Sequence, residues 1–145
     1  MMQSLSSSRR LFLKTLARLY GVLFLLPLFP SRILAALHPE ELLVRRVARI
    51  WGRPRGSAVL IGEVCLQEAV PEREAQRVAQ WILFHAPALA DACRESDDQR
   101  FQIVVRQQIQ QDFATGEVVN VAGYVLSATE VRLCSLAALV TRQGP

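Results

Sequence analysis

The first 36 residues constrain the fold most, because their pattern sets them apart from the rest of the chain. A polar, basic stretch over 1–18 precedes an apolar run of 11 residues over 19–29. A helix needs about 20 apolar residues to cross a bilayer, and Pro27 would break one here, so the run is typical of an export signal. We therefore expect residues 1–36 to be a signal peptide and residues 37–145 to fold as one domain.

Two consecutive arginines indicate the export route. They lie in Ser-Arg-Arg-Leu-Phe-Leu-Lys, residues 8–14, ahead of the apolar run. This matches a twin-arginine (Tat) signal, an address read by a receptor. The positions that fit the motif are Ser8, Arg9, Arg10, Phe12, Leu13 and Lys14. The Tat route carries proteins that are already folded in the bacterial cytoplasm, often with a cofactor or partner in place, so we expect the chain in the periplasm.

The sequence leaves open whether the signal is removed. Ala35 and Ala36 suit a cleavage site, but Ile33 or Leu34 would then occupy a position that prefers a small side chain. Cleavage and a retained N-terminal anchor are the two outcomes.

The basic character of the chain comes mostly from the signal. Residues 1–36 hold five of the 17 basic residues and none of the 13 acids, which leaves 12 arginines against 13 acids, a net charge of −1. A nucleic-acid-binding domain needs a basic face, so we expect no nucleic-acid partner. The one lysine is Lys14, so the domain has neither a Schiff-base lysine nor a phosphate-loop lysine.

Hydrophobic periodicity over residues 37–145 predicts an all-α domain of about five helices. Their expected starts, at prolines or capping side chains, are Pro39, Ser57, Pro71, Ser96 and Ser127. A further short turn or two is expected over 87–94. Ser127 and Glu130 are placed for a capping box, and the β-branched segment 118–125 is expected to be a short hairpin or an extended arm.

Apolar spacing also assigns the inward side of each helix. The inward residues are Leu43, Val47, Ile50 and Trp51 in the first helix, Leu60, Val64 and Ala69 in the second, Ala75, Val78, Trp81, Ile82 and His85 in the third, and Phe101, Val104, Val105, Ile109 and Phe113 in the fourth. The last helix is apolar on more than one face. It is therefore either central to the domain or docked on a partner.

Sequence motifs for catalysis are missing: there is no G-x-S-x-G, H-E-x-x-H, G-x-G-x-x-G or phosphate-binding glycine loop. His85 is more simply a partly buried structural histidine than a catalytic base. Two histidines and three dispersed cysteines make a poor metal site. We expect no catalytic residue, no metal and no cofactor in this chain.

The cysteines are Cys65, Cys93 and Cys134, an odd number in an oxidising compartment. Cys65 and Cys93 lie on neighbouring helical segments and are candidates to pair. Cys134 is then the candidate for a bond to another chain. The alternative for Cys134 is a buried free thiol, which behaves as a small apolar side chain.

Residues 116–136 read Gly-Glu-Val-Val-Asn-Val-Ala-Gly-Tyr-Val-Leu-Ser-Ala-Thr-Glu-Val-Arg-Leu-Cys-Ser-Leu. Together with the Tat signal, this segment resembles the small subunits of membrane-bound flavin dehydrogenases that oxidise sorbitol, fructose, glucose or gluconate. The matching positions are Gly123, Tyr124, Ser127, Thr129, Glu130, Arg132 and Leu133. Residues 38–113 match that family only in size and helical character.

The resemblance implies a non-catalytic subunit. In that family the small subunit is the chaperone and export escort of a GMC-type large subunit that carries FAD and lacks a signal of its own, and a cytochrome c subunit often takes the electrons. The resemblance also implies that the chain lies on the periplasmic side of the inner membrane and is associated with that membrane through its complex. We assign partner contacts to Tyr124, Arg132, Leu133 and Leu136. The first alternative is a stand-alone periplasmic helical binding or structural protein, and the second is an independent enzyme.

Overall fold

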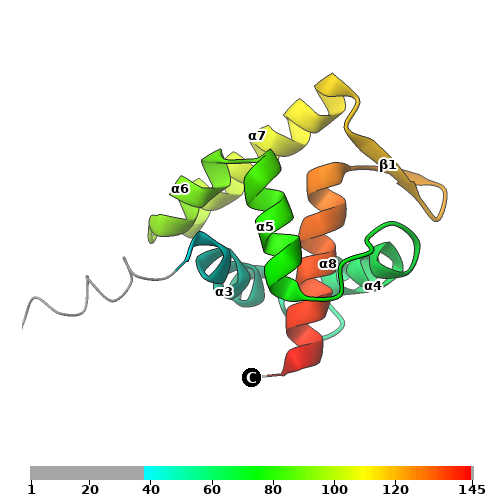
Figure 1. The fold of residues 1–145 in the computed structure, drawn as a ribbon, viewed down its shortest axis with the longest axis horizontal. Helices are drawn as coiled ribbons and strands as arrows, with labels where there is room; N and C mark the ends of the chain where they lie inside the picture. Colours follow the sequence, from blue (N-terminus) through cyan, green and yellow to red (C-terminus); the bar gives the residue numbers. More distant parts are fainter. Residues whose placement is uncertain (1–37, 145) are drawn as a thin grey trace, which may run out of the picture. The chain divides into compact units, whose positions relative to one another are not determined.

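The computed structural model describes residues 38–144, which form six helices and one two-stranded antiparallel sheet (Figure 1). The elements are α3 (Pro39–Trp51), α4 (Ser57–Glu68), α5 (Ala75–His85), α6 (Ala88–Arg94), α7 (Asp98–Thr115), β1 (Val118–Val121), β2 (Tyr124–Ser127) and α8 (Ala128–Gln143). The prediction of an all-α domain is confirmed, and the short turn or two expected over 87–94 forms a helix of its own, α6. The predicted signal, with its Tat motif and cleavage site, lies outside the described residues.

The last helix, α8, lies at the centre of the domain, with α3, α4, α5 and α7 packed around it (Figure 1). Its buried side chains include Val131, Leu133 and the five consecutive residues from Ser135 to Leu139. Five consecutive residues span more than one helical turn, so this part of α8 is covered on every side. Of the two alternatives for this helix, the central position is the one the fold adopts.

The packing of α4 on α8 depends on Gly62. A Cβ atom at this position would lie 1.9 Å from the carbonyl oxygen of Cys134 and 3.0 Å from the Cβ of Ala138. Glycine lowers helix stability on its own, but here it allows one backbone to touch the other. At one end of the same contact, Arg142 Nε donates to Glu63 Oε1 at 2.9 Å.

The predicted inward side of α4 is wrong at Leu60, whereas Val64 and Ala69 are partly buried against the core. Leu60 is exposed, and the buried residues are Val59, Gly62, Cys65 and Leu66. The expectation for Leu60 rests on the spacing of the larger apolar side chains. The face against α8 instead carries the small residues Gly62 and Cys65, because the two helices are too close for larger ones.

Three further expectations need correction. The third helix begins at Ala75 and not at Pro71. His85 is exposed, because it lies in the last turn of α5 where the chain leaves toward α6. The N-cap of α7 is Asp97 and not Ser96: Asp97 Oδ1 accepts from the Gln99 N–H at 2.8 Å.

The segment expected as a hairpin or an arm is a hairpin. Its register pairs Val118 with Ser127 and Val121 with Tyr124, around a two-residue turn. The turn residues Ala122 and Gly123 have φ of 50° and 83°. Positive φ at both positions is the geometry of a type I′ turn, which matches the twist of the strands.

A buried arginine fastens α3 to the segment between α6 and α7. Arg46 donates to the carbonyl oxygen of Asp97 at 3.1 Å and to that of Glu95, and its guanidinium lies 5.3 Å from the ring centre of Phe101. The carbonyl groups satisfy a charge that would otherwise be costly to bury. This role could not be predicted from the sequence, because Arg46 stands next to Arg45 in an ordinary charged stretch.

Candidate partner-binding surface

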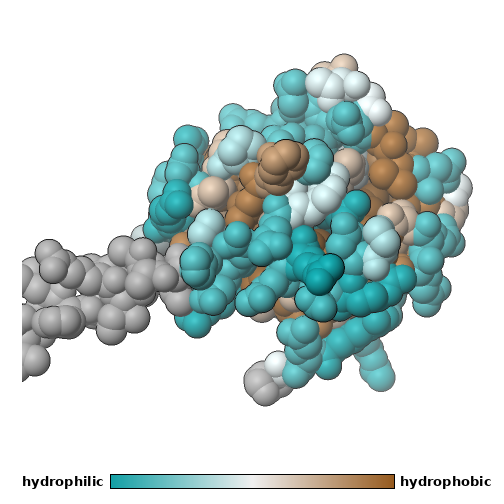
Figure 2. Space-filling model, viewed as in Figure 1, coloured by the Kyte–Doolittle hydropathy of each residue, from teal (hydrophilic) through white to brown (hydrophobic). Residues whose placement is uncertain are grey.

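The hairpin presents apolar side chains to solvent. Val119, Val121 and Leu126 face the core, whereas Val118, Tyr124 and Val125 are exposed. The register places Val118 and Val125 on the outer face of the hairpin and Tyr124 opposite Val121, beside the turn. We call these three exposed residues the hairpin surface. Tyr124 is 73 % exposed and Val125 is 58 % exposed. Figure 2 shows hydrophobic side chains gathered over the hairpin.

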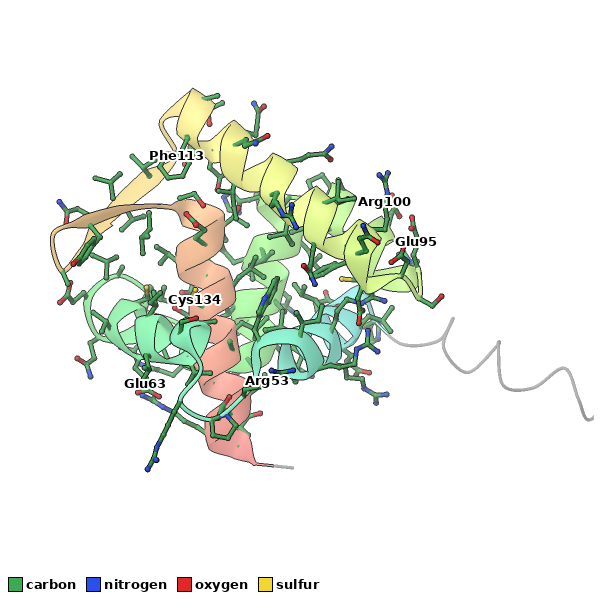
Figure 3. All side chains as sticks on the ribbon, turned by 180° about the vertical axis from the view of Figure 1, so that it is seen from behind. Arg53, Glu63, Glu95, Arg100, Phe113 and Cys134 are labelled. Atoms are coloured by element: carbon green, nitrogen blue, oxygen red, sulfur yellow. The ribbon has the colours of Figure 1, made fainter. Side chains whose placement is uncertain are left out.

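Phe113 extends this apolar region. It lies at the C-terminal end of α7, beside the start of the hairpin, and is 48 % exposed (Figure 3). The sequence placed Phe113 in the core, but α7 runs past its neighbours before Gly116, in the left-handed conformation, ends it. Single exposed apolar residues are normal, but several in one part of a small domain are typical of an interaction surface.

The hairpin leads directly into α8 through the predicted capping box, which is confirmed. Ser127 Oγ accepts from the Glu130 N–H at 3.0 Å, and Glu130 Oε2 accepts from the Ser127 N–H at 3.0 Å. Two N–H groups that the helix itself cannot satisfy are thereby paired.

Asp112 of α7 is a second cap for the same helix. Its Oδ2 accepts from the Thr129 N–H at 2.8 Å, and its Oδ1 accepts from Gln108 Nε2 at 2.8 Å. The buried carboxylate faces the positive end of the α8 dipole, which stabilises it there. Our sequence reading missed Asp112. The sequence did contain a clue. Asp112 follows the inward residue Val105 by seven positions, which places it on the same side of the helix, shortly before the stop at Gly116.

The turn of the hairpin is fixed to α4. The Ala122 N–H donates to Glu68 Oε2 at 2.8 Å, and the Gly123 N–H donates to Asn120 Oδ1 at 3.1 Å. The first bond joins the turn to α4, and the second joins two residues within the hairpin. The hairpin surface is therefore presented in one orientation.

Arg132 makes contacts within the domain. Its Nη1 lies 2.6 Å from Glu72 Oε2, and its guanidinium lies 4.1 Å from the ring centre of Trp81. The other ring against Trp81 is that of His85, stacked at 3.8 Å. Burial acts to raise the pKa of Glu72, but the hydrogen bond and charge of Arg132 outweigh it and lower that pKa below its usual value.

Of the four residues assigned to partner contacts, Tyr124 alone is widely exposed. Leu133 and Leu136 are buried in the core, so their assignment to a partner is wrong: the apolar side chains that suggested docking are covered by the other helices of the domain. Arg132 is mostly buried against Glu72 and Trp81.

A second exposed aromatic group lies at the end of α5. Phe84 is 83 % exposed, and its ring meets that of His85 edge-on at 5.1 Å. Figure 2 shows a hydrophobic group over α5, apart from the one over the hairpin. Through Trp81, this end of α5 is connected to Arg132.

All three cysteines carry free thiols, and the suggested Cys65–Cys93 pair is not formed. Cys65 belongs to α4, which packs on α8, whereas Cys93 belongs to α6, which packs on α3 and α7. Burial raises the pKa of Cys93 to about 11 and that of Cys134 to about 12. Both thiols are therefore protonated and unreactive in the folded domain near neutral pH.

Within residues 38–144, no three His, Cys, Asp or Glu side chains gather in a way that would hold a metal ion. None of the helices in this range combines the length and apolarity needed to cross a membrane. Comparisons of the chain with protein-family models, with curated proteins and with solved structures found no match.

Proposed function

We propose that this chain is the non-catalytic small subunit of a flavin-dependent dehydrogenase, and that it binds, stabilises and escorts the FAD-carrying subunit through the Tat route to the periplasm. The observation that carries the proposal is the hairpin surface. The segment by which the chain resembles dehydrogenase small subunits folds into this exposed apolar hairpin and the capped start of α8.

The Tat signal gives the proposal its physical reason. A small helical domain without a cofactor has little need to fold before export. A flavoprotein does, because its FAD is inserted in the cytoplasm. A partner without a signal therefore reaches the periplasm by binding a chain that has one.

The hairpin surface suits such a partner. Its residues Val118, Tyr124 and Val125 are apolar, and Tyr124 adds a hydroxyl group for the rim of a contact. The hydrogen bond from Ala122 to Glu68 holds the hairpin before binding, so little conformational freedom is lost when the complex forms.

The export experiment replaces Arg9 and Arg10 with lysine in the source bacterium. Lysine lacks the planar fork of arginine, so the double variant should stay in the cytoplasm. The flavin dehydrogenase should stay there with it, measured as periplasmic flavin-linked dehydrogenase activity. If that activity reaches the periplasm undiminished while this chain stays behind, the escort role is wrong.

The binding experiment compares two surface variants. Tyr124→Ser with Val125→Ser should reduce recovery of the flavoprotein on the affinity-tagged chain at least tenfold. Ile103→Ser, on the exposed side of α7, is the control and should leave recovery unchanged. Circular dichroism confirms that each variant is folded. Equal recovery with both variants would place the contact elsewhere, and recovery of the chain without any flavoprotein would favour the stand-alone periplasmic protein.

A further inference from the structure

Two of the three cysteines belong to the contact between α4 and α8. Gly62 touches the backbone of Cys134, and Cys65 follows Gly62 by three residues, which places it on the same side of α4. Cys65 is fully buried, and Cys134 is partly buried. Figure 3 labels Cys134 where α8 meets α4.

The electrostatics of Cys134 agree with this placement of Cys65. Burial is the main cause that raises the pKa of Cys134, and a negative charge on Cys65 is the next. Such an effect between two side chains requires a short separation in a poorly solvated place. A glycine contact brings the helix backbones nearer than larger side chains would, which suits a disulfide, whose Cβ atoms lie only about 3.8 Å apart.

We propose that Cys65 and Cys134 form a disulfide that joins α4 to α8 when the chain meets an oxidising compartment. The oxidant is a disulfide of the thiol–disulfide exchange class, such as an oxidoreductase disulfide or oxidised glutathione. This inference does not depend on the proposed function, because it concerns two residues of one domain.

The exchange takes place in two steps. One cysteine thiolate attacks the oxidant disulfide, forms a mixed disulfide and releases one oxidant thiolate. The second cysteine thiolate then attacks the sulfur of the first cysteine, forms the Cys65–Cys134 bond and releases the other oxidant thiolate. The protein loses two electrons and two protons, and the oxidant gains both as two thiols.

Burial sets the timing of this reaction. The raised pKa values of Cys65 and Cys134 keep both thiols protonated while the helices are packed. The bond therefore forms quickly when the reduced chain folds in the presence of the oxidant. It forms slowly in a domain that is exported already folded, because the α4–α8 contact must first open. Cys93, on α6, stays reduced.

The test refolds the reduced full chain in a mixture of reduced and oxidised glutathione, followed by alkylation and digestion after arginine. Cys65 lies in the fragment 56–73, Cys134 in 133–142 and Cys93 in 78–94, so each pairing gives a distinct mass. We expect the first two fragments to be linked and Cys93 to be alkylated. The linked protein should melt roughly 10 °C higher than the reduced one, because the bond closes a long loop.

Matched variants complete the test. Cys93→Ala should keep both the linked fragments and the rise in Tm, whereas Cys65→Ala and Cys134→Ala should each lose both. Three alkylated cysteines after refolding, or a link that includes Cys93, would overturn the proposal. A link whose formation does not raise Tm would also overturn it, because the helices would then have moved apart to accommodate the bond.

Discussion

The α4–α8 contact and the β1–β2 hairpin use their side chains in opposite ways. At the contact, Gly62 leaves no room for even a Cβ atom, and small residues allow two helices to be buried against each other. In the hairpin, two strands of four residues keep Tyr124 and Val125 in water. The first region holds the domain together. The second packs Val121 into the core but leaves other apolar residues in water, a pattern that is typical of interaction surfaces.

The largest expected effect is at the contact. Gly62→Ala places a Cβ 1.9 Å from the Cys134 carbonyl oxygen, and backbone cannot move as a flexible side chain would. We expect a loss of about 3 kcal/mol or more in the free energy of unfolding, measured by urea titration. Gly116→Ala is the control, where φ is 79° and no atom lies within 4 Å. It should cost about 1 kcal/mol. Equal losses would mean that α4 and α8 are not in backbone contact.

The next effect is at the junction of the two regions, where α8 begins. Asp112→Ala removes the buried acceptor of the Thr129 N–H and should cost about 2 kcal/mol. Ser127→Ala should cost about 1 kcal/mol, and Glu130→Ala somewhat less. Asp112→Asn keeps an acceptor oxygen and should cost less than Asp112→Ala. If Asn and Ala behave alike at position 112, the hydrogen bond to Thr129 is not what stabilises the helix start.

The third effect depends on pH. The pKa of Glu72 is lowered in the folded domain by Arg132, although burial opposes this. A carboxylate whose pKa falls on folding stabilises the fold above its unfolded pKa, and that stability is lost as pH falls through its folded pKa. Glu72→Gln should therefore cost about 1 kcal/mol at neutral pH and progressively less below about pH 4. Glu74→Gln breaks an exposed pair with Arg77 and should change stability by less than about 0.5 kcal/mol at any pH. If the cost of Glu72→Gln does not diminish in acid, the stabilisation does not come from the negative charge of Glu72.

The sequence predicted several features that local rules determine, although the expected start at Pro71 and cap at Ser96 were wrong, and it missed what tertiary contacts determine. The helix starts at Pro39 and Ser127, the stop at Gly116 and the capping box each depend on a few neighbouring residues, and the structure has them all. Leu60 was wrongly placed on the inward side of α4, because periodicity weighs large apolar side chains, whereas the contact with α8 selects small ones. Asp112 and Arg46 were missed because their partners are 17 and 51 residues away. Leu133 and Leu136 were assigned to a partner for the same reason: apolar residues look alike whether the surface they cover is within the domain or outside it.

The smallest effect tests whether the hairpin contributes to stability separately from its proposed role in binding. Ala122 has φ of 50°, a left-handed conformation that costs an alanine about 1 kcal/mol and that asparagine adopts more readily. Ala122→Asn should therefore stabilise the domain by about 0.5 kcal/mol, seen as a rise of a few degrees in Tm. Its backbone N–H still reaches Glu68, so the hairpin surface keeps its orientation and recovery of a partner should not change. Ala114→Asn makes the same substitution within α7 and should instead destabilise by about 0.5 kcal/mol, because asparagine is a poorer helix former than alanine.

If both substitutions destabilise alike, the turn is not held in the left-handed conformation. If Ala122→Asn stabilises the domain but lowers partner recovery, the turn itself contacts the partner, and the binding surface extends from Tyr124 and Val125 to the tip of the hairpin.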